Sequence, residues 1–416
     1  MIIRIIENER LDKYMQQDNI INNRIKTSNK IYPFLAGLSD DLMFWAAINT
    51  IFLTIVKGFN ASQISMLAAI ASFSSIIFQK IIFRIIKKIG NLKSFRVGLI
   101  MFLLAAIIIT FEKNIFIIAI GFIIYYLAYY FTNMGNVILK RNLKAINCEN
   151  DFAKIQSKTS LVYAITTMVN SFIVGFLFNI NNYLPMIICI LICIINLYLS
   201  RYLYEYKDEK IVLEDNNNSK VSWSKIIILI ILVYGLLYAT VESLQENGKI
   251  FIQYRMESFI SIDKTSIYLT IIIAFSRVAR VLSNLLFNKV HSVLKNKLII
   301  LLNILLLFSI VFMILGFIIP YNDISFIIMG IGFFILLFIR DPIAIFTKIE
   351  LFNNCKIKDQ EAVIHKYNLC RKIVRCFLAT FASLLLLKIN MLYLMVILFV
   401  LCLMYLCLTI KLFRNL

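Results

Sequence analysis

Twelve apolar stretches, each long enough to cross a lipid bilayer, occupy most of this 416-residue chain. A membrane-spanning helix needs ~20 apolar residues to cross a hydrocarbon core of ~30 Å. Runs such as residues 226–237 are apolar on both faces, whereas the strands of a membrane barrel alternate in polarity. The sequence therefore predicts an all-α protein that crosses the membrane many times. The predicted spans are residues 32–56, 61–82, 95–111, 114–137, 156–179, 183–200, 224–246, 264–287, 297–319, 323–347, 360–387 and 390–411.

The composition excludes a soluble enzyme, because 61% of the residues are hydrophobic and the mean hydropathy is +0.84. We find no glycine-rich phosphate loop, zinc-ligand pair or nucleophile elbow in the sequence, so neither an enzyme nor ATP-driven transport by this chain alone is expected. Six of the eight cysteines lie inside predicted spans, and Cys148 and Cys355 lie in loops. We therefore expect no disulfide, no metal site and no cofactor.

The basic residues predict the orientation of the chain in the membrane. With the turns that flank each connection included, 31 Lys and Arg residues fall in the even-numbered connections and the two termini, against six in the odd-numbered connections. Basic loops stay in the cytoplasm, so both termini of this multi-pass protein are expected on the cytoplasmic side of the cell membrane. The formal charge of +20 is then explained by topology and attraction to anionic lipid rather than by a nucleic-acid partner.

A polar segment, residues 201–223, lies near the centre of the chain and is predicted to link two six-helix halves, residues 31–200 and 224–416. Residues 1–30 are predicted to form a cytoplasmic arm. A shift of about 203 residues places Asn60 over Asp263, each a possible N-cap at the start of a span. A shift of about 209 residues superimposes Asp151 on Gln360. This order of matches is typical of a duplicated six-helix unit, and such repeats are common in secondary transporters.

With six plus six helices, a central linker, both ends inside and a short basic connection between the second and third spans, the chain resembles the major facilitator superfamily over its whole length. The resemblance implies two pseudo-symmetric six-helix bundles around a central passage. It also implies that spans 1, 4, 7, 10 and 2, 5, 8, 11 line the passage, while spans 3, 6, 9 and 12 support the bundle from outside.

The family carries a motif, Gly-x-x-x-Asp-Arg/Lys-x-Gly-Arg/Lys-Arg/Lys, between the second and third spans. In residues 83–93 of this chain only Lys88 and Gly90 have the expected types, while Phe83 replaces the first glycine and Lys87 replaces the acid. Because that acid helps to latch the cytoplasmic side in the family, the substitution argues against a latch made in the same way. Lys88 and Gly90 remain candidates for a gating or structural role.

Charged residues inside the predicted spans are candidates for function, since a charge at the bilayer centre costs at least ~2.5 kcal/mol and needs a partner, a water-filled cavity or a function. Spans 3, 6, 9 and 12 carry no charge in their interiors. The costly residues thus fall only on the spans that the resemblance places along the passage. They are Asp40, Asp41, Glu242, Arg277, Arg280, Arg340, Asp341, Arg371, Lys372 and Arg375.

The basic residues of this group suggest a cationic wall in the second half. Arg277 and Arg280 share one face of the eighth span, and Arg375 lies deeper than its neighbours in the eleventh span. We expect these three to line a substrate path, with a structural ion pair as the alternative. Arg371 and Lys372 can snorkel to the cytoplasmic interface and are expected to be structural.

The adjacent residues Arg340 and Asp341 are followed by Pro342. They are expected to form an ion pair near a helix end that stabilises a kink.

Asp40 and Asp41 are the candidates for proton coupling. On a helix their side chains point about 100° apart, so one of them is expected to face the passage. A carboxylate there would respond to burial and to nearby arginine, with a static ion pair as the alternative. Glu242 is a third candidate, and a solvated helix end also explains it.

Neutral polar residues give weaker predictions. Asn133 and Asn170 could bind substrate, although Asn side chains often join membrane helices together. Tyrosines at helical spacing on the fourth span (Tyr125, Tyr126, Tyr129 and Tyr130) are expected to pack in the core or at the interface. Glycine and proline are scarce, so we expect no broken helices of the kind that coordinate sodium, which favours protons as the coupling ion.

The sequence thus predicts a secondary active, proton-coupled transporter of a small anionic, zwitterionic or amphipathic solute that works as a monomer by alternating access. Its expected partners are that solute, protons and membrane lipid. Three alternatives remain open. They are a multidrug or antibiotic efflux protein of the same family, a lipid-linked saccharide flippase of a different fold, and a membrane sensor that transports nothing.

Overall fold

The computed structural model describes residues 2–148, 151–206, 225–320, 323–354 and 360–415, and every regular element in these ranges is helical. The first half contains α1 (Ile2–Leu38), α2 (Trp45–Ile51), the π-helix η1 (Phe52–Val56), α3 (Ala61–Ile89), α4 (Asn91–Phe111), α5 (Ile115–Thr132), α6 (Met134–Ala145), α7 (Asp151–Ile180), α8 (Leu184–Leu199) and η2 (Ser200–Tyr202). The second half contains α10 (Lys225–Glu257), α11 (Ile262–Leu294), η3 (Lys295–Lys297), α12 (Leu298–Ile318), α13 (Asp323–Asn353), α14 (Gln360–Leu386) and α15 (Met391–Asn415).

Each of the twelve predicted spans corresponds to one helix or to a broken helix, and the all-α prediction is confirmed. Within the described ranges, ten helices are long and apolar enough to cross a membrane. The other two predicted spans do not form a helix that is both long and apolar enough, for reasons visible in the structure. The first span is interrupted, and α14 carries Arg371, Lys372 and Arg375 within one turn and a half.

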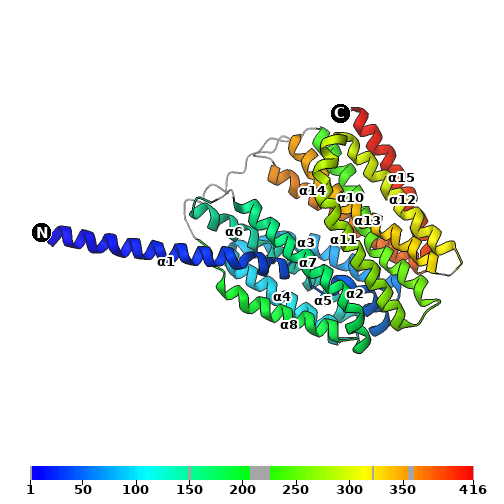
Figure 1. Cartoon of the computed structure of the whole chain (residues 1–416), viewed down its shortest axis with the longest axis horizontal. Coiled ribbons are helices and arrows are strands. Elements are labelled where there is room, and N and C mark those ends of the chain that lie inside the picture. The colour runs from blue at the N-terminus through cyan, green and yellow to red at the C-terminus, as the bar shows by residue number, and fades with distance from the viewer. Residues whose placement is uncertain (1, 149–150, 207–224, 321–322, 355–359, 416) are drawn as a thin grey trace.

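The first span departs from the prediction of one continuous helix over residues 32–56. α1 runs from Ile2 through the predicted arm to Leu38, and its N-terminal part projects away from the bundle (Figure 1). The chain then leaves the helical conformation until Trp45. Here Ser39 donates a hydrogen bond to the carbonyl of Leu35 at 2.7 Å, and Asp41 accepts one from the amide of Leu42 at 2.7 Å.

Scarce glycine and proline therefore do not exclude a broken helix in this span, while the absence of sodium coordination stays a prediction. Glycine and proline are not the only residues that end a helix. Short polar side chains can also occupy the backbone groups that a helix needs, and here the Asp41 carboxylate accepts from the Leu42 amide.

The two halves lie side by side and pack through symmetry-related helices (Figure 1). α3 packs along α14, and α7 packs along α11, so that the second span meets the eleventh and the fifth meets the eighth. The approach of α7 to α11 is close at Gly175, where a Cβ atom would lie 2.3 Å from Oγ1 of Thr270 and 3.2 Å from Cα of Ile267. The absence of a side chain at Gly175 permits this contact.

Two ends of the bundle are distinguished below. The Asn60 end carries the odd-numbered connections, and the Gly90 end carries the even-numbered ones. At the Asn60 end, side chains join the halves directly. The hydrogen bonds are Ser62 Oγ to the Ser383 carbonyl at 2.7 Å, Ser266 Oγ to Asn179 Oδ1 at 2.6 Å and Gln253 Nε2 to Thr54 Oγ1 at 2.5 Å. The halves are thus closed against each other at this end.

The predicted repeat is partly visible at the helix starts. Asn60 caps α3 in a capping box, because its side chain accepts from the Gln63 amide at 2.8 Å while Gln63 accepts from the Asn60 amide at 3.0 Å. Asp263, by contrast, lies inside the first turn of α11, whose N-cap position is Ser261. The proposed equivalence of Asn60 and Asp263 is therefore wrong by two residues.

Candidate functional site

A cavity of about 560 Å³ lies between the two halves and is lined by residues from both. The first half contributes the break after α1, together with α2, η1, α3, α5 and α7, and the second half contributes α10, α11, α13 and α14. Ten acidic or basic residues line the cavity. They are Asp40, Asp41, Glu242, Glu246, Lys249, Arg277, Arg340, Arg371, Lys372 and Arg375.

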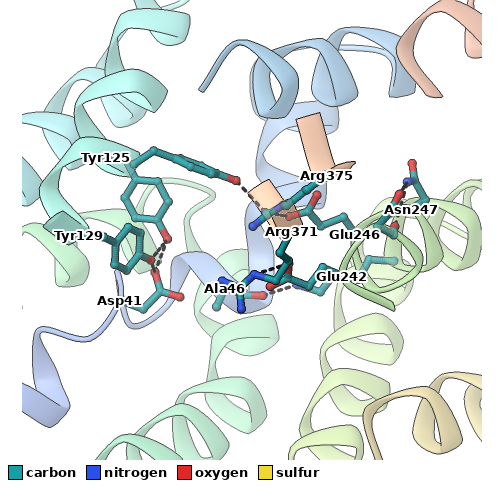
Figure 2. A network of polar contacts seen from close by, with 12 residues as sticks. Asp41, Ala46, Tyr125, Tyr129, Glu242, Glu246, Asn247, Arg371 and Arg375 are labelled. Carbon is teal, nitrogen blue, oxygen red and sulfur yellow. Dashed lines mark hydrogen bonds and ion pairs between the residues drawn. The ribbon is translucent and has the colours of Figure 1, made fainter. Parts of the chain in front are cut away.

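Both aspartates of the first span line this cavity. The prediction that only one would face the passage assumed a helix, and the non-helical backbone at residues 39–44 removes that restriction. Oδ1 of Asp41 accepts three hydrogen bonds, from the Leu42 amide at 2.7 Å, from the Tyr129 hydroxyl at 2.9 Å and from the Tyr125 hydroxyl. Figure 2 shows Asp41 beneath these tyrosines. Asp41 is therefore held in place by its neighbours.

Asp40 has a different environment from Asp41. It is exposed to the cavity, and its carboxylate makes no hydrogen bond or ion pair within the described ranges. Asp41 and Arg280 lie close enough to Asp40 to interact with it electrostatically. Of the two carboxylates, Asp40 is thus the one that solvent or a solute can reach without first displacing a protein donor.

Two ion pairs connect α10 to α14 across the second half. Glu242 lies 3.6 Å from Arg371, and Glu246, one turn further along α10, binds Arg375, one turn further along α14. Figure 2 shows both pairs on the side of the cavity opposite Asp41. Arg375 also donates to the Tyr126 hydroxyl at 2.9 Å, which links it to the first half.

The predicted surroundings of Glu242 and Arg371 were incorrect. Glu242 does not lie at a solvated helix end, because α10 continues to Glu257. Arg371 does not extend to the interface as predicted, since it turns toward Glu242. Lys372 lines the cavity, where it donates to the Tyr130 hydroxyl at 2.5 Å and lies 4.0 Å from the ring centre.

Lys249 is a cavity residue that the sequence analysis missed. Its side chain is 5% exposed, and Nζ donates to the carbonyl of Ala46 in α2 at 2.6 Å. Lys249 fell outside the predicted seventh span because that span was ended at residue 246. The apolar run of residues 250–252 directly after the lysine is the signal that could have extended the helix.

The predicted ion pair between Arg340 and Asp341 does not form. Asp341 instead binds Arg280 through two hydrogen bonds, Nε to Oδ2 at 2.9 Å and Nη2 to Oδ1 at 3.1 Å. Adjacent residues on a helix point about 100° apart, so Arg340 and Asp341 face different neighbours. The predicted helix end is also wrong, because α13 passes through Pro342 and continues to Asn353. Arg280 is consequently bound to an acid and does not line the cavity.

Arg277 and Arg340 both line the cavity. Arg277 is 6% exposed. Within the described part of the chain, neither guanidinium has a hydrogen-bond or ion-pair partner, and Nε of each is buried without one. These two residues are therefore the cations of the cavity that the protein itself leaves unpaired.

The remaining predicted residues divide between the cavity and the Gly90 end. Asn133, at the junction of α5 and α6, lines the cavity, whereas Asn170 of α7 is buried elsewhere. Lys88 lies in the last turn of α3, and Gly90 forms the turn into α4 with φ of 84°, a conformation that favours glycine. Neither Lys88 nor Gly90 contributes to the cavity.

The connection at Gly90 is held by an acid from elsewhere in the sequence. Glu205, just after η2, accepts hydrogen bonds from the Asn91 side chain at 2.7 Å and from the Leu92 amide at 3.0 Å, and pairs with Arg141 at 3.0 Å. Glu205 therefore caps α4. The family motif has an acid where this chain has Lys87. The Glu205 carboxylate, from another part of the sequence, lies at the same end of the bundle.

The tyrosines of α5 were expected to pack in the core or at the membrane interface. The core packing is confirmed, since Tyr125 and Tyr130 are buried core residues and Tyr126 and Tyr129 pack against the core. Three of them, Tyr125, Tyr126 and Tyr129, also line the cavity and bind its charged residues. Trp45 and Tyr163 add to the same aromatic wall. Within the described residues, no cluster of three or more His, Cys, Asp or Glu side chains could hold a metal ion.

Comparison with known proteins agrees with this architecture. The sequence model described as Major Facilitator Superfamily matches residues 34–346, which is more than half of the chain. The crystal structure of the nucleoside transporter NupG is similar with a TM-score of 0.73 and 12% identity, over 94% of this chain and 99% of that one. The crystal structure of a bacterial homologue of the iron transporter ferroportin in the inward-facing state has a TM-score of 0.65 and 13% identity, over 94% and 98% of the two chains. At such identities the structures show the fold alone. No curated protein matches the chain significantly.

Proposed function

Because the chain belongs to the Major Facilitator Superfamily, we propose that it is a secondary active transporter of the cell membrane. It would move a small anionic, zwitterionic or amphipathic solute by alternating access and couple that movement to protons. The observation that carries this proposal is the cavity between the halves, which gathers ten charged side chains from both. Buried charge of this kind is costly in a membrane protein unless it meets water, a partner or a solute.

The contacts between the halves support alternating access. The helix pairs α3–α14 and α7–α11 connect the halves, and hydrogen bonds such as that of Ser62 to Ser383 close the Asn60 end. With both termini in the cytoplasm, the Asn60 end is the outer one, so this arrangement corresponds to a state closed toward the outside. Rocking of one half against the other would break these bonds and expose the cavity to the opposite side.

For the proton, we assign pick-up to Asp40 and a positioning role to Asp41. Three hydrogen bonds to one oxygen hold the Asp41 carboxylate in place. Asp40 is open to the cavity and lies beside a second carboxylate and near Arg280. Its protonation would change the charge of the cavity wall, and that change can favour one orientation of the halves over the other.

The two rivals from other classes fit less well. A saccharide flippase would have a different fold, and the chain belongs to the Major Facilitator Superfamily instead. A sensor that transports nothing was expected to have a dry centre with all charges paired, whereas Arg277 and Arg340 line a cavity without a protein partner. Efflux of amphipathic compounds would use the same architecture and differs from uptake only in direction.

The test is solute-driven proton movement in proteoliposomes that contain a pH-sensitive dye. We expect at least one member of a metabolite and antibiotic library to change the internal pH. In Asp40→Asn that change should be lost while the same solute still raises the melting temperature of the purified protein. Asp323→Asn, at the exposed start of α13, is the matched control. A protein that binds solutes but moves neither solute nor protons would contradict the proposal.

A further inference from the structure

The cavity carries more basic than acidic residues, and the basic ones are not equivalent. Of the six basic residues, Arg371 and Arg375 are paired with glutamates, Lys372 donates to a tyrosine hydroxyl and Lys249 donates to a backbone carbonyl. These four are already engaged with the protein. Arg277 on α11 and Arg340 on α13 are the two that are left.

Arg277 and Arg340 line the same cavity, and the charge of Arg340 acts on Arg277. Among the residues that the structure describes, neither arginine forms an ion pair, and Asp341, the acid nearest to Arg340 in sequence, binds Arg280 through two hydrogen bonds. The charges of Asp341 and Glu242 act on Arg340, and that of Asp41 acts on Arg277, only from a distance. Two like charges held together in a low-dielectric setting are unfavourable unless an anion joins them. Arg277 is at the same time more than nine-tenths buried, so bulk water reaches it poorly.

We propose that Arg277 and Arg340 form an oxyanion site that binds a carboxylate or phosphate group of the transported solute. The planar fork of a guanidinium matches the two oxygens of such groups, and two guanidiniums can bind one oxyanion from two sides. This assignment rests on the proposed transport function only for its claim that the bound anion is the transported one. It narrows the substrate class to organic anions and zwitterions.

The opposite wall indicates how the rest of the solute lies. Asp40 and Asp41 repel an anion, so the oxyanion is confined to the second half. Tyr126 and Trp45 offer aromatic surface to the body of the solute, and an amino group on that body would meet Asp40. The site therefore places the negative end of the solute on the half opposite to the proton-binding residue.

The test is thermal unfolding of the purified full-length protein with acetate or with inorganic phosphate as the probe, at constant ionic strength and with chloride as the reference. A specific site gives a saturable rise in melting temperature with anion concentration. A rise with phosphate alone identifies a phosphate group as the ligand, and a rise with acetate alone identifies a carboxylate. A rise with both identifies a site for either group.

In Arg277→Gln and in Arg340→Gln the apparent affinity for the anion should fall at least about tenfold, since each change removes charged donors to the oxyanion. Arg277→Lys keeps the charge without the fork and should give an intermediate loss. Arg255→Gln is the control, because Arg255 is bound to the Ile319 carbonyl outside the cavity. The measured quantity is the shift caused by the anion, so a change in the intrinsic stability of a variant does not affect it.

The inference is overturned if neither acetate nor phosphate stabilises the wild-type protein beyond chloride, or if both glutamine variants respond as the wild type does. Solute-driven proton flux measured on the same preparations separates the two proposals. Intact flux without any anion effect removes the oxyanion site alone. An anion effect that depends on both arginines, without flux for any solute, removes the transport proposal and leaves the site.

Discussion

Nζ of Lys249 donates a hydrogen bond to the carbonyl of Ala46 at 2.6 Å, and this bond ties the second half to the first span next to the break at residues 39–44. The carbonyl belongs to α2, which begins only at Trp45. The lysine is almost fully buried. A buried lysine bound to backbone across the two halves is therefore part of the contact that holds the Asn60 end closed.

Replacing Lys249 should loosen that contact. A hydrogen bond contributes about 0.5–1.5 kcal/mol, so Lys249→Met should shift the equilibrium toward opening of the Asn60 end by up to about tenfold. Lys249→Gln keeps a donor and should shift it less. Spin labels placed on α3 and α14 near Ser62 and Ser383 would report the change as longer distances. Equal distance distributions in wild type and Lys249→Met would contradict this role.

The tyrosines that bind Asp41 should stabilise the fold. Tyr125→Phe and Tyr129→Phe each remove one hydroxyl donor from the half-buried Asp41 carboxylate, and each should cost about 1–3 kcal/mol of stability. Tyr393→Phe, on the exposed surface of α15, is the control and should be neutral. Thermal unfolding of the three variants provides the comparison. A loss in Tyr393→Phe as large as in the other two would show that the effect is not specific to Asp41.

Removing one partner of the Glu246–Arg375 ion pair should cost more stability than removing both partners. Glu246→Gln leaves Arg375 without its acid and should cost about 1–3 kcal/mol, less than a fully buried pair because the Glu246 side chain is 36% exposed. The double variant Glu246→Gln/Arg375→Gln removes both charges and should recover most of the loss. Thermal unfolding in a double-mutant cycle measures the coupling. Additive losses from the two single changes would argue against an energetic pair.

Those features of the fold that depend on local free energies could be predicted from the sequence. The helical spans follow from runs of apolar residues, and the cost of burying charge singled out Asp40, Asp41, Arg277 and Arg375, all of which line the cavity. Each of these inferences needs only a residue and its neighbours along the chain.

Features that depend on partners far apart in sequence could not be predicted. Asp341 binds Arg280, 61 residues earlier, rather than its neighbour Arg340, and this choice decides which arginine remains free for a solute. Lys249 is kept inside the membrane by a carbonyl 203 residues away. The break after α1 was missed for another reason, since residues 39–44 contain serine and aspartate but no glycine or proline.

Stability at alkaline pH should depend on Lys57, which follows η1 outside the membrane-spanning segments. Burial, and then the charge of Lys113, lower the pKa of Lys57 from its usual 10.5 to about 8, although Glu112 acts in the opposite direction. The unfolded chain therefore binds the proton more tightly than the folded one. The cost to stability is fully present below pH 8 and is relieved as the pH rises from about 8 toward 10.5.

Lys57→Met should remove this pH-dependent cost. Between pH 8 and 10.5 the wild type should therefore gain stability relative to the variant. Lys57 is only half-buried, so the change should be small, and it should shrink further in high salt. Melting temperatures of both proteins across the interval provide the measurement. A difference that stays constant between pH 8 and 10.5 would contradict the lowered pKa.

The close approach of α7 to α11 makes a last prediction about glycine. In Gly175→Ala the new Cβ would meet Thr270 and the backbone of α11, and the resulting overpacking should cost about 1–3 kcal/mol and hinder closure of the Asn60 end. Gly330→Ala is a matched control in α13, because its Cβ would lie no closer than 3.6 Å to Ile272. It should be neutral or gain up to about 1 kcal/mol from better helix propensity. Thermal unfolding distinguishes the two, and equal effects would show that the two halves do not meet at Gly175.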